Sequence, residues 1–278
     1  MRRWDMHVHT NWSDGSVDVN DVVRFAAAEG LSGIAITDHD AVDMILPAKE
    51  QAARNGIEII DGIELSTMDK DTGRKVHILV YYPRNIEALQ PHIKAINERR
   101  YAAGEKMIEI LKNRFPISRE QVENYSSRSK TIYRTHIMQA LMDMGYSEQV
   151  YGELYNELFG KNGSCLCKVI YTETIAAAKM ARESGGVVIL AHPGVYNSFE
   201  IGEKLASMGL IDGIENSYPR KKAQDEAKHQ YLIEKYKLLT SGGTDYHGFY
   251  SSDPKPLGTC FALQNEVLAI KELSDKRR

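Results

Sequence analysis

Short apolar runs alternate along the chain with longer segments in which apolar residues recur at helical spacing, and several of these longer segments end at glycine. Repeated units of this kind predict a parallel β-sheet covered by helices, and their number predicts an α/β fold with a closed or nearly closed (β/α) barrel. The expected strands are 4–9, 33–36, 58–60, 76–82, 187–191, 211–215 and 237–240. The expected helices of the barrel are 17–29, 42–54, 174–183 and 223–236.

The middle of the chain has a different pattern, because no segment between residues 86 and 159 favours a strand. Apolar residues at helical spacing predict only helices there. These expected helices are 93–111, 132–144 and 148–158. We therefore expect a helical insertion over residues 86–164, which interrupts a barrel formed by residues 1–85 and 165–278.

The first half of this insertion is rich in arginine and lysine. On a helix such side chains most often form a solvated face. Arg128, Lys130 and Arg134 instead lie on or beside a serine-rich loop. We expect these three side chains to contact an anion.

Composition narrows the range of functions. The chain has 278 residues with 42% hydrophobic residues, which suits one large domain or one domain with an insertion. A formal net charge of −3 gives no general attraction for long duplex nucleic acid. Three cysteines, an odd number without a secreted spacing, favour the reducing cytoplasm. No apolar run is long enough for a signal peptide or a membrane span.

Most of the nine histidines stand at or near the ends of expected strands, beside carboxylates, glycine or proline. These six are His7, His9, His39, His77, His192 and His247. His92 and His229 fall in ordinary charged helices, where a surface position is expected, and His136 lies in the insertion beside Arg134.

Taken singly, each of these residues has an ordinary structural explanation, such as a hydrogen-bonded core histidine or a turn. Together they predict a metal site. His7 and His9 point to the same side of their strand, and Glu64 and Asp245 also follow buried runs. Polar residues at equivalent strand ends would meet at one mouth of a barrel, where burying them without a cation would be costly.

The blocks DMHVHT, SDG, TDHD, GIELS, VHIL, AHPG and GTDYHG resemble the polymerase and histidinol phosphatase (PHP) family. The resemblance implies a distorted seven-stranded TIM-like barrel that holds up to three metals. The implied ligand sets are His7, His9, Glu64 and Asp245 for the first metal, Glu64, His77 and His192 for the second, and Asp14, His39 and His247 for the third.

The resemblance extends to the branch of the family that hydrolyses nucleotide phosphoesters. Some members of the family have histidine where this chain has Asp14, and the acid at this position resembles that branch. Arg134-Thr135-His136 is similar to an Arg-Pro-His element that binds phosphate from the inserted domain, although Thr135 replaces the proline. Arg134 and His136 are therefore expected to bind the substrate.

Ligands of imidazole and carboxylate without thiolate suit two to three ions of Mn, Fe or Zn, among which the sequence does not choose. We expect a hydroxide bridging two metals to attack phosphorus, with Asp245 held as a ligand close to the reaction. The source of the proton for the leaving group stays open among a metal-bound water, His192 and His247.

The expected function is hydrolysis of a phosphate ester of a small nucleotide, which the resemblance suggests is a nucleoside 3′,5′-bisphosphate, or of a short oligonucleotide end. Lys168 and the tyrosines of the insertion, Tyr125, Tyr133, Tyr151 and Tyr155, are candidates to line a base pocket, although packing is the commoner role for each tyrosine. The alternatives are a histidinol phosphatase and a metal-bound regulatory module without turnover.

Overall fold

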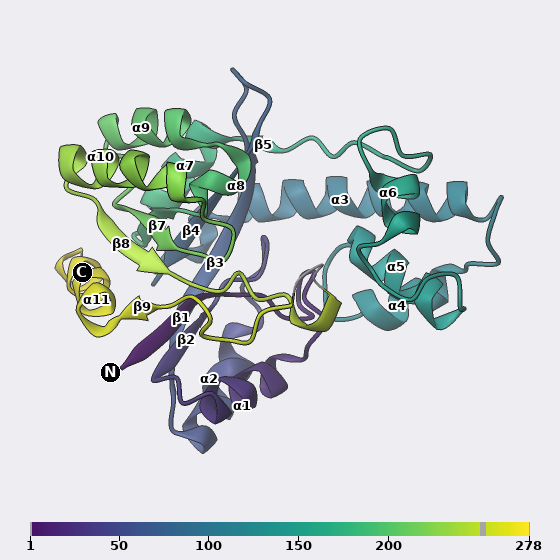
Figure 1. Ribbon diagram of the computed structural model, residues 1–278, viewed down its shortest axis with the longest axis horizontal. Helices are drawn as coiled ribbons and strands as arrows, with labels where there is room; N and C mark the ends of the chain where they lie inside the picture. Colours follow the sequence, from purple (N-terminus) through teal and green to yellow (C-terminus); the bar gives the residue numbers. More distant parts are fainter. Residues whose placement is uncertain (1, 251–253, 278) are drawn as a thin grey trace.

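The computed structural model describes residues 2–250 and 254–277, and shows a barrel-like sheet wrapped by helices, from which a helical lobe projects (Figure 1). The strands are β1 (Arg3–Val8), β2 (Gly33–Ile36), β3 (Glu58–Met68), β4 (Lys75–Tyr81), β5 (Thr172–Glu173), β6 (Val187–Leu190), β7 (Gly213–Ser217), β8 (Leu239–Gly242) and β9 (Ala262–Leu263). The helices are α1 (Val19–Ala28), α2 (Ile45–Asn55), α3 (Gln90–Leu111), α4 (Arg119–Ser126), α5 (Arg134–Asp143), α6 (Glu153–Phe159), α7 (Thr174–Glu183), α8 (Pro193–Tyr196), α9 (Phe199–Ser207), α10 (Glu226–Tyr236) and α11 (Gln264–Lys276). Three short 3₁₀ turns complete the described elements: Ile86–Ala88, Ala223–Asp225 and Gly248–Tyr250.

The strands follow the order β8-β7-β6-β4-β3-β2-β1-β9, and β5 pairs with β3. The α/β class and the distorted barrel expected from the sequence are confirmed. The expectation of a purely parallel sheet is wrong at β4, which runs antiparallel to both β3 and β6. A short turn over residues 69–74 joins β3 to β4, and strands joined in this way must be antiparallel.

The sequence also underestimates β3, which continues eight residues beyond the expected end at Ile60. Gly62, Glu64 and Ser66 look like a polar loop after a short strand. In the structure they belong to the strand itself, and Glu64 and Ser66 are buried side chains at the functional end of the barrel. Because functional polar residues interrupt the interior of this strand, its hydrophobicity pattern does not predict its full length.

The barrel approaches closure between the segment that follows β8 and strand β1. The amide of His9 donates to the carbonyl of Tyr246 (2.8 Å), and the amide of Tyr246 donates to the carbonyl of His7 (3.2 Å). Gly243 permits this contact, because a Cβ there would lie 2.4 Å from Cβ of His7. Closure therefore brings the first and last functional motifs of the chain side by side.

Amphipathic helices cover the barrel as the pattern predicts. Asp18 caps α1 by accepting from the amide of Asn20 (3.0 Å), a common way to satisfy a free donor at a helix start. The apolar face of α1 then lies against the sheet through Val19, Val22, Val23 and Ala26, which are fully buried.

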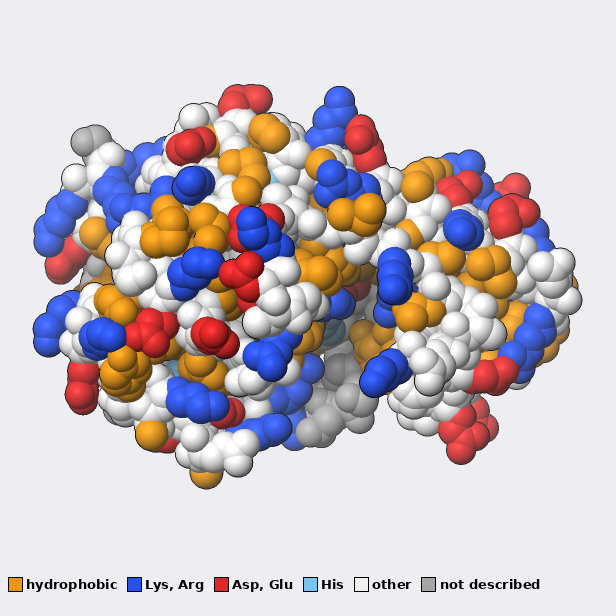
Figure 2. Space-filling view, turned by 90° about the horizontal axis from the view of Figure 1, so that it is seen from above, with side chains coloured by type: hydrophobic (Ala, Val, Ile, Leu, Met, Phe, Trp, Pro, Cys, Tyr) orange, Lys and Arg blue, Asp and Glu red, His pale blue; other side chains and the backbone are white. Residues whose placement is uncertain are grey.

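Helix α3 belongs to both parts of the molecule. Ile93, near its start, packs in the barrel core, whereas Met107, near its end, packs in a separate hydrophobic cluster of the lobe. That second cluster joins α3 to α4, α5 and α6, so the lobe has an apolar core of its own. Figure 2 shows a hollow between the barrel body and the lobe, with lysine and arginine side chains on both sides of it. No helix in the described part of the chain combines the length and the apolar character that crossing a membrane requires.

The expected surface positions of His92 and His229 are wrong, because both side chains are buried. Nε2 of His92 lies 2.7 Å from Oδ1 of Asp40, and Nδ1 of His229 lies 2.9 Å from the carbonyl oxygen of Asp225. Each histidine lies on a helix face that a neighbouring element covers, and a sequence rich in charges does not reveal that cover.

Candidate metal centre and active site

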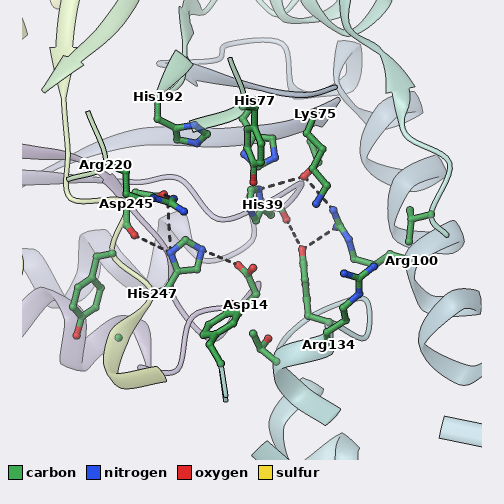
Figure 3. A pocket seen from close by; sticks show the side chains of 18 of the residues that line it. Asp14, His39, Lys75, His77, Arg100, Arg134, His192, Arg220, Asp245 and His247 are labelled. Carbon is green, nitrogen blue, oxygen red and sulfur yellow. Dashed lines mark hydrogen bonds and ion pairs between the residues drawn. The ribbon is translucent and has the colours of Figure 1, made fainter. Parts of the chain in front are cut away.

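The structure brings all nine expected metal ligands together at one rim of the barrel, where Figure 3 shows six of them around a pocket. Most of them follow the carboxyl ends of strands, as expected for a barrel enzyme. His77 lies near the start of β4, and the antiparallel direction of β4 brings that start to the same rim. The nine residues are His7, His9, Asp14, His39, Glu64, His77, His192, Asp245 and His247.

The first expected set is compact. Nε2 of His7 and Nε2 of His9 lie 3.1 Å apart, and they lie 3.2 and 3.1 Å from Oε2 of Glu64. Oδ1 of Asp245 lies 3.6 Å from the first nitrogen and 3.4 Å from the second. Donor atoms of all four residues fall within 4.8 Å of one another, as the ligands of a single ion would.

The second expected set uses the other oxygen of Glu64. Oε1 lies 2.9 Å from Nδ1 of His77 and 3.0 Å from Nε2 of His192. Glu64 therefore faces two groups of imidazoles at once, so it would contribute one carboxylate oxygen to each of two ligand sets. His192 has a positive φ of 22°, a strained conformation of the kind that persists at functional sites.

The third expected set also forms a cluster. Donor atoms of Asp14, His39, His247 and His9 lie within 4.8 Å of one another. Oδ1 of Asp14 lies 3.4 Å from Nε2 of His247 and 3.8 Å from Nδ1 of His9. The sequence assigned His9 to the first set alone, whereas its two ring nitrogens face two different sets.

Several of the ligand atoms at this rim lack hydrogen-bond partners within the protein and are suited to bind cations. Oε2 of Glu64, Oδ1 of Asp14 and Nδ1 of His192 are buried without a hydrogen-bond partner. Leaving such atoms unsatisfied typically costs about 1–3 kcal/mol each. Facing imidazole nitrogens and unsatisfied carboxylate oxygens are what a bound divalent ion would satisfy, so the residues fit a metal centre.

The electrostatics lead to the same conclusion. Burial alone would lower the pKa of His9, but Asp245 and Glu64 outweigh burial and raise it to about 10. Burial would raise the pKa of Glu64, but His7 and His39 hold it well below its usual range. The carboxylates thus stay anionic and draw positive charge toward themselves.

Glu215, in the middle of β7, is a functional residue that the sequence interpretation missed. This buried carboxylate lies 3.2 Å from Nδ1 of His7 and accepts the amide of His192 (2.7 Å). An outer carboxylate of this kind fixes the tautomer of a ligand, so that Nε2 of His7 is free for metal. Its position at the end of a buried apolar run was the available signal.

A cavity of about 470 Å³ opens above the ligands, between the barrel rim and the lobe (Figure 3). The volume lies within the range of small-molecule sites. The lobe side of the wall includes Tyr133, Tyr151 and Tyr155, three of the four tyrosines proposed for a base pocket. Tyr125 and Lys168 are not among the described residues that line it.

Of the expected anion ligands, Arg134 alone lines this cavity. His136 is buried, with Nε2 at 2.9 Å from the carbonyl oxygen of Ser13 and Nδ1 accepting the amide of Tyr133 (3.2 Å). It therefore joins the lobe to the loop that carries Asp14, and both its nitrogens are engaged.

Arg128 and Lys130 lie outside the cavity wall, with side chains 52% and 61% exposed. Each faces a carboxylate of the barrel body. Arg128 lies 3.5 Å from Asp18, and Lys130 lies 2.8 Å from Asp43. Instead of facing the cavity, these two cations lie in exposed ion pairs between the lobe and the barrel.

Four other cations line the cavity, and the sequence did not single them out: Lys75, Arg100, Arg220 and Lys255. Arg100 is buried and lies 3.1 Å from Asp40, although its place in a charged helix suggested a solvated face. Arg220 lies 2.7 Å from Oδ2 of Asp245. These residues differ from other basic residues because the fold places them at the cavity, and the local sequence pattern does not predict that position.

Comparison with known proteins agrees with this geometry. The model of the PHP domain family matches residues 5–181. The chain belongs to the PHP domain family. It is 33% identical over 252 residues to the phosphoribosyl 1,2-cyclic phosphate 1,2-diphosphodiesterase of Eggerthella lenta, a match that covers 90% of this chain and 96% of that one.

A second PHP relative is the 3′,5′-nucleoside bisphosphate phosphatase of Chromobacterium violaceum, 28% identical over 89% of this chain and 88% of that one. A solved structure from Bifidobacterium adolescentis, assigned as a metal-dependent phosphoesterase, matches with a TM-score of 0.88 and 26% identity over 97% of this chain and 96% of that one. The expected class of enzyme, a metal-dependent phosphoric ester hydrolase, is confirmed.

Proposed function

We propose that this PHP protein hydrolyses a phosphate ester of a small ribose phosphate that carries two phosphate groups, with a nucleoside 3′,5′-bisphosphate or a short oligonucleotide end as the first candidates. The observation that carries the proposal is the ligand cluster on the floor of a cavity of about 470 Å³. A cavity of this size suits a nucleotide, and we propose that a long duplex is not a substrate.

Two or three divalent ions, of Mn, Fe or Zn, would be held by the three ligand sets, with His192 joined to the second set through its contact with Glu64. When bound, such ions neutralise phosphate charge and acidify a water molecule that can attack phosphorus. The chain itself orients the reaction: Glu64 spaces the two groups of imidazoles, and Glu215 fixes the ring of His7.

The substrate residues act from the lobe. Arg134 offers forked donors that match phosphate oxygens, and it reaches the cavity from the start of α5. Tyr133, Tyr151 and Tyr155 supply aromatic faces for a base. His192 and His247 remain candidates for the proton donor only when they are not metal ligands, so a metal-bound water is the third candidate.

A second candidate is the cyclic phosphate of a phosphorylated ribose. The relative named as a phosphoribosyl 1,2-cyclic phosphate 1,2-diphosphodiesterase matches this chain almost end to end. Its substrate and that of the nucleoside bisphosphate phosphatase are both riboses with two phosphate groups. This shared chemistry is the reason to define the substrate by its two phosphates.

Steady-state rates with added Mn²⁺ test the proposal. The panel contains adenosine 3′,5′-bisphosphate, phosphoribosyl 1,2-cyclic phosphate, a short 5′-phosphorylated RNA and histidinol phosphate. We expect at least one of the first three to exceed histidinol phosphate in kcat/KM by about tenfold or more, equivalent to about 1.4 kcal/mol. Histidinol phosphate as the fastest substrate would favour the phosphatase alternative, and no turnover with metals bound would favour a regulatory module.

We also propose that the protein acts in the reducing cytoplasm. Its three cysteines, Cys165, Cys167 and Cys260, are free thiols in the structure.

A further inference from the structure

Three cations gather on the lobe side of the cavity: Lys75 of β4, Arg100 of α3 and Arg134 of α5 (Figure 3). Among the described residues, Arg100 alone has a carboxylate partner within ion-pair distance, because it lies 3.1 Å from Asp40. Like charges repel more strongly where water is partly excluded. A wall with two uncompensated cations beside a metal centre therefore favours a bound anion.

Lys75 is half-buried, and its ammonium faces two aromatic rings. It lies 5.5 Å from the ring centre of Tyr171 and 6.0 Å from that of Tyr196. In the described part of the chain, no carboxylate approaches it within 4.0 Å. Arg134 is in the same state, with its guanidinium 5.9 Å from the ring centre of Phe159. Aromatic faces hold both cations in place without neutralising them.

The other basic residues near the cavity differ in this respect. Arg220 lies 2.7 Å from Asp245 and is engaged with a metal ligand. Lys255, which also lines the cavity, has an interaction partner of its own. Arg128 and Lys130 form exposed ion pairs outside the cavity. Half-burial without a counter-charge therefore sets Lys75 and Arg134 apart.

The position of Lys75 along its strand gives the spacing of the site. Lys75 and His77 are two residues apart on β4, so their side chains leave the same face of the strand. Two residues of a strand span about 7 Å. A single sugar ring with an ester oxygen on each side bridges a distance of this order.

We propose that Lys75, together with Arg134, binds the phosphate group that is not hydrolysed, while the other phosphate lies on the ligand cluster. Lys75 is thus a specificity-determining residue, and it selects substrates that carry a second phosphate. This inference rests on the proposed function and adds that the ligand cluster binds the phosphate that is hydrolysed, whereas Lys75 and Arg134 bind the one that is retained.

The experiment compares wild type with Lys75→Met on two substrates, adenosine 3′,5′-bisphosphate and p-nitrophenyl phosphate, in enzyme loaded with Mn²⁺. Loss of a charge-assisted hydrogen bond should lower kcat/KM for the bisphosphate about 10- to 100-fold, mainly through KM. The substrate with one phosphate should change by less than about twofold, since uniform binding of that group is untouched. Lys75→Arg should restore most of the loss.

The matched control is Lys94→Met, an exposed lysine of α3 that pairs with Glu98 at 4.0 Å. It should change neither substrate. Calorimetry with adenosine 5′-monophosphate, which retains one phosphate, should show affinity about tenfold weaker in Lys75→Met and unchanged in Lys94→Met. Circular dichroism and metal content identify a variant that has lost its fold or its ions.

The outcomes separate the inference from the function on which it rests. Equal losses on both substrates, or no loss on the bisphosphate, would overturn the role of Lys75 while the hydrolase stands. A wild-type enzyme that cleaves p-nitrophenyl phosphate without preferring any substrate with two phosphates would do the same. A metal-loaded wild type that cleaves no phosphoester would overturn the proposed function instead.

Discussion

Two buried carboxylates, Asp40 and Glu64, lie on adjacent segments of the barrel rim and have opposite surroundings. Asp40 accepts hydrogen bonds from the amide of Ser66 (2.9 Å) and from Arg100 (3.1 Å), and lies 2.7 Å from Nε2 of His92. Oε2 of Glu64 is surrounded by imidazole nitrogens at 3.1–3.2 Å, yet it has no hydrogen bond. The protein satisfies the carboxylate of Asp40 with hydrogen bonds, whereas Oε2 of Glu64 has no hydrogen-bond donor and is available to a cation.

The comparison shows that histidine and acid in contact do not by themselves indicate a metal site. Arg100 supplies Asp40 with a permanent positive charge, and β3 supplies it with a backbone donor. Burial would raise the pKa of Asp40, but the hydrogen bond with His92 and the charge of Arg100 hold it well below its usual range. The imidazoles around Oε2 of Glu64 are titratable, so a metal ion would supply the fixed charge that this cluster lacks.

Replacement of Glu64 by Gln is the sharpest test of this contrast. The change keeps the shape of the side chain and removes the charge that faces two groups of imidazoles. We expect kcat to fall by about 10³-fold or more, which corresponds to about 4 kcal/mol. Mass spectrometry of the purified variant should find fewer bound ions, and a full complement would contradict the bridging role.

Removal of metal should affect both activity and stability. Ions that bind only the folded chain stabilise it by about 4 kcal/mol at a thousandfold excess over Kd. Dialysis against EDTA should abolish turnover and lower Tm in calorimetry, and Mn²⁺ should restore both. An unchanged Tm would indicate that the ligands are compensated without ions.

Replacement of Asp40 by Ala should instead destabilise the protein while leaving ions bound. It removes the partner of Arg100 and His92 and leaves buried charge unpaired, which costs about 3–5 kcal/mol. Urea unfolding measures the loss. A drop in metal content without a drop in stability would reverse the roles assigned to Asp40 and Glu64.

Replacement of Arg134 by Met should weaken substrate binding without releasing metal. We expect KM to rise about 10- to 100-fold, because a charged phosphate contact is lost. Kinetics together with metal analysis test both halves of the statement. Unchanged KM would remove the lobe from substrate recognition.

The smallest effect should come from Arg128→Ala and Lys130→Ala. Their exposed ion pairs with Asp18 and Asp43 are worth about 0–1 kcal/mol. We expect kcat/KM to change by less than about twofold and Tm by about a degree. A tenfold loss of activity would restore these residues to the substrate site and weaken the contrast with Arg134.

Much of the fold and of the metal centre could be predicted from the sequence, because buried apolar runs mark the strands and the histidines and acids that follow them mark the site. His7 and His9 share a strand face by simple alternation, and Asp245 follows a buried run. The direction of β4 could not be predicted from apolar periodicity, since the same apolar run serves either direction. The turn over residues 69–74 that reverses the chain is an ordinary polar loop in the sequence.

The substrate side was harder to predict because its residues are defined by long-range contacts. His136 and Arg134 are two positions apart on α5, yet one is buried against the Asp14 loop and the other lines the cavity. Lys75 and Arg100 lie in unremarkable charged surroundings along the chain. Their importance arises from the opposing surfaces that the fold brings to them, which local patterns do not contain.

The 22 residues of α3 form one rod, about 33 Å long, which starts in the barrel core and ends in the core of the lobe. Asn97 and Arg100 fasten its near half to Asp40. The lobe is consequently tied to the barrel by a continuous helix and by buried hydrogen bonds. Because the lobe supplies Arg134 and three tyrosines to the cavity while the barrel supplies the metal-ligand candidates, exchanging the lobe should alter substrate preference and leave the ligand cluster intact.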